Sequence, residues 1–94
     1  MTHDLGAAAM RGRRTALDVR WTEGRDGAIH ATWGPWRGIG VFDFSVRRVG
    51  DRWRAVVERV SPRLRREATD ETRDEAALWC EETAWAIHAE ETTR

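Results

Sequence analysis

The sequence predicts an α+β domain in which a four-stranded antiparallel sheet carries one C-terminal α-helix packed across one face. Three patterns support this prediction. They are two stretches of alternating apolar and polar residues, a two-residue turn between two longer alternating stretches, and a capping motif before a run with helical spacing. Ninety-four residues suit a single domain. With 40% hydrophobic residues, six Trp among them, the chain can form a core although 34% of it is charged.

The N-terminal residues differ from the rest of the chain. Residues 1–15 show no period and contain Arg11, Arg13 and Arg14, which predicts a flexible basic arm. The single α+β domain is then expected over residues 16–94.

Two alternating stretches predict the first hairpin. Residues 23–27 include two glycines and separate residues 17–22 from residues 28–33, as a hairpin loop does. In both stretches every second residue is apolar, so these residues are expected on one face of the hairpin. They are Leu17, Val19, Trp21, Ile29, Ala31 and Trp33. Gly34-Pro35 ends the second strand.

The second hairpin has a defined register. Gly50-Asp51 lies between residues 39–49 and 52–60 and suits a two-residue turn. With this loop Val49 faces Arg52, and the inward face consists of Phe42, Phe44, Val46, Trp53, Ala55 and Val57. Ser61-Pro62 ends the fourth strand, and a linker is expected to follow, with three arginines, Arg63, Arg65 and Arg66.

A helix is expected from Thr72, its N-cap, to about Glu90, with Glu75 at the capping-box position. One stripe of mostly small side chains is the expected docking face: Ala76, Ala77, Cys80, Ala84 and Ile87. Trp79 and Trp85 lie on either side of this stripe, so at least one of them should be partly exposed. The outer rows hold the acids Glu71, Asp74, Glu75, Glu81 and Glu82.

The charges are balanced in number but not in position. Sixteen Arg and sixteen Asp plus Glu give a formal net charge of zero. Residues 1–66 hold fourteen Arg and seven acids, a net of +7, whereas residues 67–94 hold two Arg and nine acids, a net of −7. This division predicts a basic surface on the arm, sheet and linker and an acidic surface on the helix.

Several function classes find no support in the residues. The chain has no Lys for a phosphate loop or a Schiff base, and Ser45 and Ser61 lie outside any nucleophile-elbow pattern. His3, His30, His88 and Cys80 lack metal-ligand spacing, and one cysteine cannot form an internal disulfide. We therefore expect a non-enzymatic protein without cofactor or metal. No run approaches the roughly 18 apolar residues of a membrane span, so a cytoplasmic location without membrane contact is expected.

One binding hypothesis uses the sheet. The register places Arg47 opposite Arg54 and Asp43 opposite Glu58. Either these four side chains form diagonal salt bridges, or the arginines bind an anion. Nucleic-acid binding would use Arg20, Arg47, Arg54, Arg63, Arg65 and Arg66. The order of elements resembles AP2-like and integrase arm-binding domains with an extra strand, which implies a sheet in the major groove. The absence of Asn and Gln removes the side chains that read adenine.

The leading hypothesis uses the helix instead. Carboxylates would occupy a basic groove on a host protein complex, and a tryptophan would anchor the contact. The expected partner-binding residues are Asp74, Glu75, Glu81, Glu82, Trp79 and Trp85. Homodimerisation through the Trp-bearing flank of the helix is a third possibility.

Two stretches carry a resemblance to known proteins. Gly50-Asp51-Arg52-Trp53-Arg54-Ala55-Val56 belongs to a hairpin with a central Trp, and Thr72-Arg73-Asp74-Glu75-Ala76 opens an Ala- and Trp-rich helix. Over residues 39–90 this arrangement resembles small phage and mobile-element proteins, a group that includes anti-CRISPR inhibitors. The resemblance implies a compact protein that binds and inhibits a host defence complex. It assigns no site residue, because anti-CRISPR proteins share no common motif.

Overall fold

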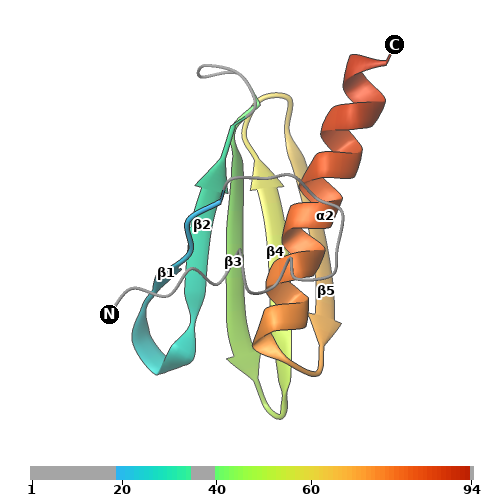
Figure 1. Ribbon diagram of the computed structural model, residues 1–94. Helices are drawn as coiled ribbons and strands as arrows, with labels where there is room; N and C mark the ends of the chain where they lie inside the picture. The colour runs from blue at the N-terminus through green and yellow to red at the C-terminus, as the bar shows by residue number, and fades with distance from the viewer. Residues whose placement is uncertain (1–18, 35–39, 94) are drawn as a thin grey trace.

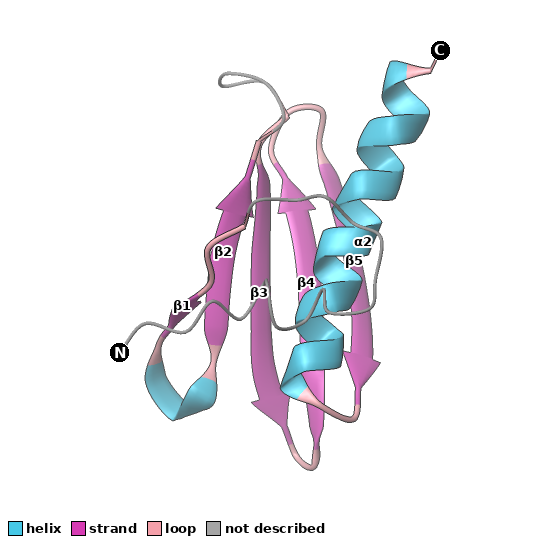
Figure 2. Cartoon of the chain, in the orientation of Figure 1, coloured by secondary structure: helices cyan, strands magenta, loops and turns pink. Residues whose placement is uncertain are grey.

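The structure, a computed structural model, describes residues 19–34 and 40–93. In chain order the elements are β1 (Thr22–Glu23), the 3-10 turn η1 (Arg25–Gly27), β2 (Ile29–Trp33), β3 (Phe42–Val49), β4 (Arg52–Arg59), β5 (Leu64–Asp70) and α2 (Arg73–Thr92). The strands form one antiparallel sheet in the order β1-β2-β3-β4-β5 (Figure 1). α2 packs against β3, β4 and β5 on one face of this sheet (Figure 2). The predicted α+β class and C-terminal helix are confirmed.

The sheet has a fifth strand that the sequence did not predict. β5 pairs with β4 from Arg59↔Leu64 to Trp53↔Asp70, in the region expected to be a linker. Its alternation is weak, because only Leu64 and Ala68 are apolar. β5 is an edge strand, and its pairing comes from backbone hydrogen bonds to one neighbour, so it can form with few apolar side chains.

The first hairpin is shorter than predicted, although its inward residues are correct. Only two residues of β1 pair with β2, Thr22 with His30 and Glu23 with Ile29. Val19 and Trp21 are buried, as the alternation predicted. The turn is closed by hydrogen bonds from Gly24 N to the Ala28 carbonyl and from Ala28 N to the Arg25 carbonyl. Leu17 and the predicted basic arm lie outside the described residues.

The second hairpin has the predicted register. β3 and β4 pair from Phe42↔Arg59 to Val49↔Arg52, around Gly50-Asp51. Gly50 has a φ of +67°, the left-handed conformation that this turn needs and that glycine adopts without strain. β3 begins three residues later than predicted and β4 ends one residue earlier, at Arg59.

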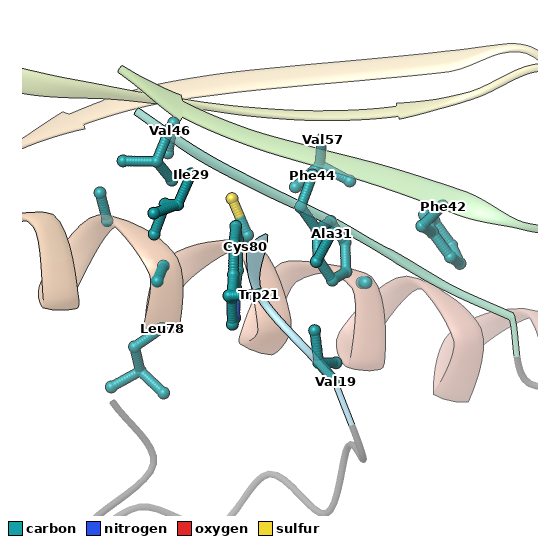
Figure 3. Close-up of a cluster of buried hydrophobic side chains, with 14 residues drawn as sticks. Val19, Trp21, Ile29, Ala31, Phe42, Phe44, Val46, Val57, Leu78 and Cys80 are labelled. Carbon is teal, nitrogen blue, oxygen red and sulfur yellow. The ribbon is translucent and has the colours of Figure 1, made fainter. Parts of the chain in front are cut away.

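The core lies between the sheet and α2, where Figure 3 shows Trp21 and Cys80 beside the strands. All five members of the predicted docking stripe face this core: Ala76, Ala77, Cys80 and Ala84 are fully buried and Ile87 partly. Small residues let the helix approach the sheet closely, so large side chains from the strands fill the space between them. The Trp21 and Phe44 rings stack with centroids 5.7 Å apart.

Thr72 is the N-cap of α2, as predicted, but the Glu75 side chain does not complete the capping box among the described residues. The Thr72 side-chain oxygen accepts a hydrogen bond from Glu75 N at 3.1 Å, and the Thr72 carbonyl accepts one from Ala76 N. The helix continues to Thr92, two residues beyond the predicted end. No helix in the described ranges is both long and apolar enough to cross a membrane.

Candidate functional site

The side of α2 turned away from the sheet presents carboxylates in a row. Glu71 precedes the helix by two residues, and Glu75 and Glu82 follow at helical spacings that place them on the same side. Glu71, Asp74 and Glu75 are exposed, and Glu82 is half-buried. We call these four residues, together with Trp79 and Trp85, the acidic face.

The two tryptophans lie on either side of the acidic row. Trp79 is four residues after Glu75, and Trp85 is three residues after Glu82. Trp85 is 42% exposed, and Trp79 is half-buried against the core, which confirms that at least one of them is partly exposed. The Trp85 ring also contacts Trp33, at a centroid distance of 6.4 Å, so its orientation is supported by β2.

Three acids of this face, Glu71, Asp74 and Glu75, are not paired with an arginine of the described residues. The pKa of the neighbouring Asp70 is raised, chiefly by burial and further by the negative charge of Glu75. The positive end of the helix dipole offsets part of this repulsion. At the start of α2, Glu71, Asp74 and Glu75 outnumber the one arginine of the first turn, Arg73, which bonds to Glu23 and the Gly27 carbonyl.

Glu81 does not belong to the acidic face, and its predicted position in an outer row is wrong. Its side chain is fully buried, and its Oε2 accepts a hydrogen bond of 2.8 Å from the Trp21 indole nitrogen. The reason is helical geometry, because Glu81 is four residues after Ala77 and three before Ala84, both in the docking stripe. Glu81 connects the helix to the first hairpin and is not accessible to a partner.

The face of the sheet turned away from α2, which we call the outer face, carries the predicted pair of arginines. Arg47 lies opposite Arg54 in the β3–β4 register. Arg54 forms a salt bridge of 3.6 Å with Glu67 of β5. The predicted diagonal pairing of these arginines with Asp43 and Glu58 is wrong, since no such pair forms among the described residues.

Arg65 is held in the same network. It bonds to Glu58 at 2.6 Å and to Glu67 at 2.8 Å. These hydrogen bonds raise the pKa of Arg65 and lower the pKa of Glu67. The missed strand β5 thus supplies the acid that neutralises most of the outer face, and Arg47 is left without an acidic partner in the described part of the chain.

The six arginines proposed for nucleic-acid binding do not form one surface. Arg20 is exposed before β1, and Arg63 lies in the turn at the opposite end of the sheet from the β3–β4 turn. Arg66 pairs with Val57, which places it on the side of the sheet that faces α2. Only Arg47, Arg54 and Arg65 share the outer face.

Two further arginines have contacts that position the ends of the sheet. Arg48 pairs with Trp53 in the β3–β4 register, but its Nε donates to the Gly50 carbonyl, and Arg73 lies over the Trp53 ring at 5.8 Å. The sequence also gave no role to Arg59, which is buried over Phe42. Arg59 donates two hydrogen bonds, of 2.9 and 2.8 Å, to Glu91 near the end of α2. Its inward position in β4 follows from the alternation of Ala55 and Val57, a signal present in the sequence.

Comparison of the chain with protein-family models, with curated proteins and with solved structures found no match. The described residues include no group of three or more His, Cys, Asp or Glu placed to hold a metal ion. The two candidate sites are the acidic face of α2 and the outer face of the sheet.

Proposed function

We propose that this protein is a non-enzymatic inhibitor of the anti-CRISPR type, which binds a host protein complex through the acidic face of α2. One observation carries the proposal. In a chain with sixteen arginines, Glu71, Asp74 and Glu75 have no salt bridge to any described residue. The outer-face arginines Arg54 and Arg65, in contrast, are engaged by acids of the same chain.

The mechanism follows from the spacing of these groups. Carboxylates that follow one side of a helix can occupy positions in a basic groove where the phosphates of a nucleic acid would otherwise lie. Complementary charge speeds association and orients the partner, while exposed tryptophan supplies the apolar contact typical of binding hot spots. Trp85 suits this role, because its ring is 42% exposed and is supported by Trp33. A protein bound in this way blocks nucleic acid sterically, in the cytoplasm, without a catalytic step.

Nucleic-acid binding by the outer face is the second candidate. The observation in its favour is the confirmed juxtaposition of Arg47 and Arg54 across two strands. The salt bridge between Arg54 and Glu67 weakens this candidate, because it reduces the positive charge presented to phosphates. We therefore rank it below the acidic face.

A pair of matched charge-reversal variants tests the proposal. Glu75→Arg with Glu82→Arg changes the acidic face, whereas Asp43→Arg with Asp51→Arg changes the net charge equally at exposed positions in β3 and in the β3–β4 turn. Each protein is used to capture complexes from a nuclease-treated bacterial lysate, and the captured complex is then assayed for binding to its own nucleic acid. We expect the wild type and the sheet variant to capture the complex and block nucleic-acid binding, and the helix variant to do neither.

Two results would contradict the proposal. The first is equal capture and inhibition by the helix variant, provided that circular dichroism shows it to be folded. The second is a complex that forms only without nuclease and is lost in Arg47→Ala, which would favour the second candidate.

A further inference from the structure

A hollow of about 430 Å³ opens at the end of the sheet where η1 meets β3. It is lined by Arg25 from η1, His30 from β2, and Arg47 and Arg48 from β3, with Asp26 as the one acid. Arg47 and His30 lie on the outer face, whereas Arg48 is on the α2 side of the strand. The β1–β2 loop and the β3–β4 turn lie at this same end of the sheet (Figure 1). The fold thus brings Arg25 of η1 to the same hollow as the adjacent residues Arg47 and Arg48 of β3.

The charges around this hollow are not balanced from within the described residues. The lining includes three arginines and one acid, and neither Asp26 nor any of the three arginines takes part in a salt bridge among the described residues. Arg54, the cross-strand neighbour of Arg47, pairs with Glu67, so Arg47 lines the hollow without an acidic partner in the described ranges. Like charges at short range repel each other, and a bound anion would remove that repulsion.

Hydrogen bonds hold two sides of the hollow in place. Arg48 donates from Nε to the Gly50 carbonyl at 2.9 Å, which ties the end of β3 to the β3–β4 turn. The η1 turn is closed by the Gly24 and Ala28 backbone bonds and is anchored by Arg73, which donates to the Gly27 carbonyl at 2.9 Å. Arg25 therefore lies in a turn whose backbone is held in place by hydrogen bonds.

We propose that this hollow binds a phosphate group, with Arg25 and Arg47 as the charged donors and His30, which shares the outer face with Arg47, as a further contact. Each guanidinium can direct two parallel N–H groups at an oxygen pair, and a tetrahedral phosphate offers several oxygens to donors that approach from different sides. The site is independent of the proposed function, because it has the opposite charge and lies on elements other than α2. The phosphate belongs either to a phosphomonoester, as at the end of a nucleotide, or to a phosphodiester inside a strand.

Amide chemical shifts of the ¹⁵N-labelled protein, recorded during titration with inorganic phosphate at constant ionic strength, test the proposal. We expect saturable shifts confined to residues 24–30 and 46–50. Arg47→Ala should weaken the apparent Kd by about tenfold, the typical effect of removing one charge-assisted contact. Arg63→Ala is the matched control, because this exposed arginine has no salt bridge among the described residues and lies at the other end of the sheet. It should bind phosphate as the wild type does.

Short single-stranded oligonucleotides with and without a 5′-phosphate then identify the source. Shifts at the same amides with only the phosphorylated strand support a phosphomonoester site, and equal shifts with both support a phosphodiester site. The proposal is overturned if phosphate produces no saturable shift, if chloride at equal ionic strength produces the same shifts, or if Arg63→Ala weakens binding as much as Arg47→Ala.

Discussion

At the scale of single residues, the buried Trp21–Glu81 pair is a polar contact within the core. The indole N–H of Trp21 reaches the carboxylate across the interface between the first hairpin and α2, although the two residues are 60 positions apart in sequence. A buried donor without an acceptor costs free energy, so the two side chains depend on each other. The acid therefore has a structural role, and its charge cannot be reversed without disturbing the fold.

We predict that Glu81→Ala lowers the free energy of unfolding by about 1–3 kcal/mol, because the Trp21 N–H loses its acceptor. Glu81→Gln keeps an acceptor oxygen and should lose less. Urea unfolding followed by Trp fluorescence measures both, with Asp74→Asn, an exposed position on the same helix, as the control. Equal stability of Glu81→Ala and the control would show that the hydrogen bond contributes nothing.

The Cys80 thiol predicts a pH dependence of stability. Its pKa is raised, mainly by burial and then by the charge of Glu81, so the folded protein holds the thiol proton more tightly than the unfolded chain does. The contribution of this thiol to the free energy of unfolding is therefore fully present below the ordinary thiol pKa of 9.0 and is lost as the pH rises above that value. We expect a fall of up to about 1.4 kcal/mol per pH unit above that value. Cys80→Ala should show a flatter profile in urea unfolding at several pH values, and identical slopes would contradict the prediction.

At the scale of elements, patterns that involve many side chains were predicted well. The second hairpin was correct because a turn signal and the alternation of Phe42, Phe44 and Val46 agree on one register, and a slip would expose all three. The prediction of α2 was correct because the N-cap residue Thr72 and the stripe of small residues that follows it indicate the same helix. β5 was not predicted because it is an edge strand that is held mainly by backbone hydrogen bonds to β4. Such pairing does not require a regular alternation of apolar and polar side chains.

The N-cap of α2 gives a prediction at this scale. Thr72→Ala removes the acceptor for Glu75 N and should destabilise the protein by about 1 kcal/mol, whereas Thr72→Ser keeps the hydroxyl and should be close to the wild type. Thermal unfolding monitored by circular dichroism at 222 nm (a wavelength that reports helix) compares the three proteins. If the Ala and Ser variants unfold at the same temperature, the hydrogen bond is not what stabilises the helix start.

At the scale of the whole molecule, the basic and acidic parts of the sequence correspond only partly to a basic and an acidic surface. The acidic half begins at Glu67, yet Glu67 lies on the outer face and pairs with Arg54 and Arg65. Glu91 pairs with Arg59, and Glu81 is buried. A count along the sequence could not show this, because the pairing depends on β5 and on contacts between the helix and the sheet. The exposed acids at the start of α2 and the arginines of the hollow are the surplus that has no salt bridge within residues 19–34 and 40–93.

This surplus predicts weak association between copies at low salt. A protein of zero net charge and a pI near 6.8 has little overall repulsion at neutral pH, so the acidic face of one copy can contact the arginine hollow of another. The contact is head-to-tail, because it joins two different surfaces, and it can therefore form open chains of molecules as well as closed rings. At about 10 mM salt the Debye length is near 30 Å, and at 150 mM it is about 8 Å, so added salt should disperse the assemblies. Light scattering at the two salt concentrations measures the effect.

Two variants separate this association from a dimer held by apolar contacts. Glu75→Arg with Glu82→Arg should scatter as a monomer at both salt concentrations, whereas Asp43→Arg with Asp51→Arg changes the net charge equally and should keep some association because its acidic face is intact. A homodimer through the Trp-bearing flank of α2 would instead persist at 150 mM and disappear in Trp85→Ala, since screening does not weaken apolar burial. A mass that is the same at both salt concentrations in every variant would leave the unpaired charges without any role in self-association.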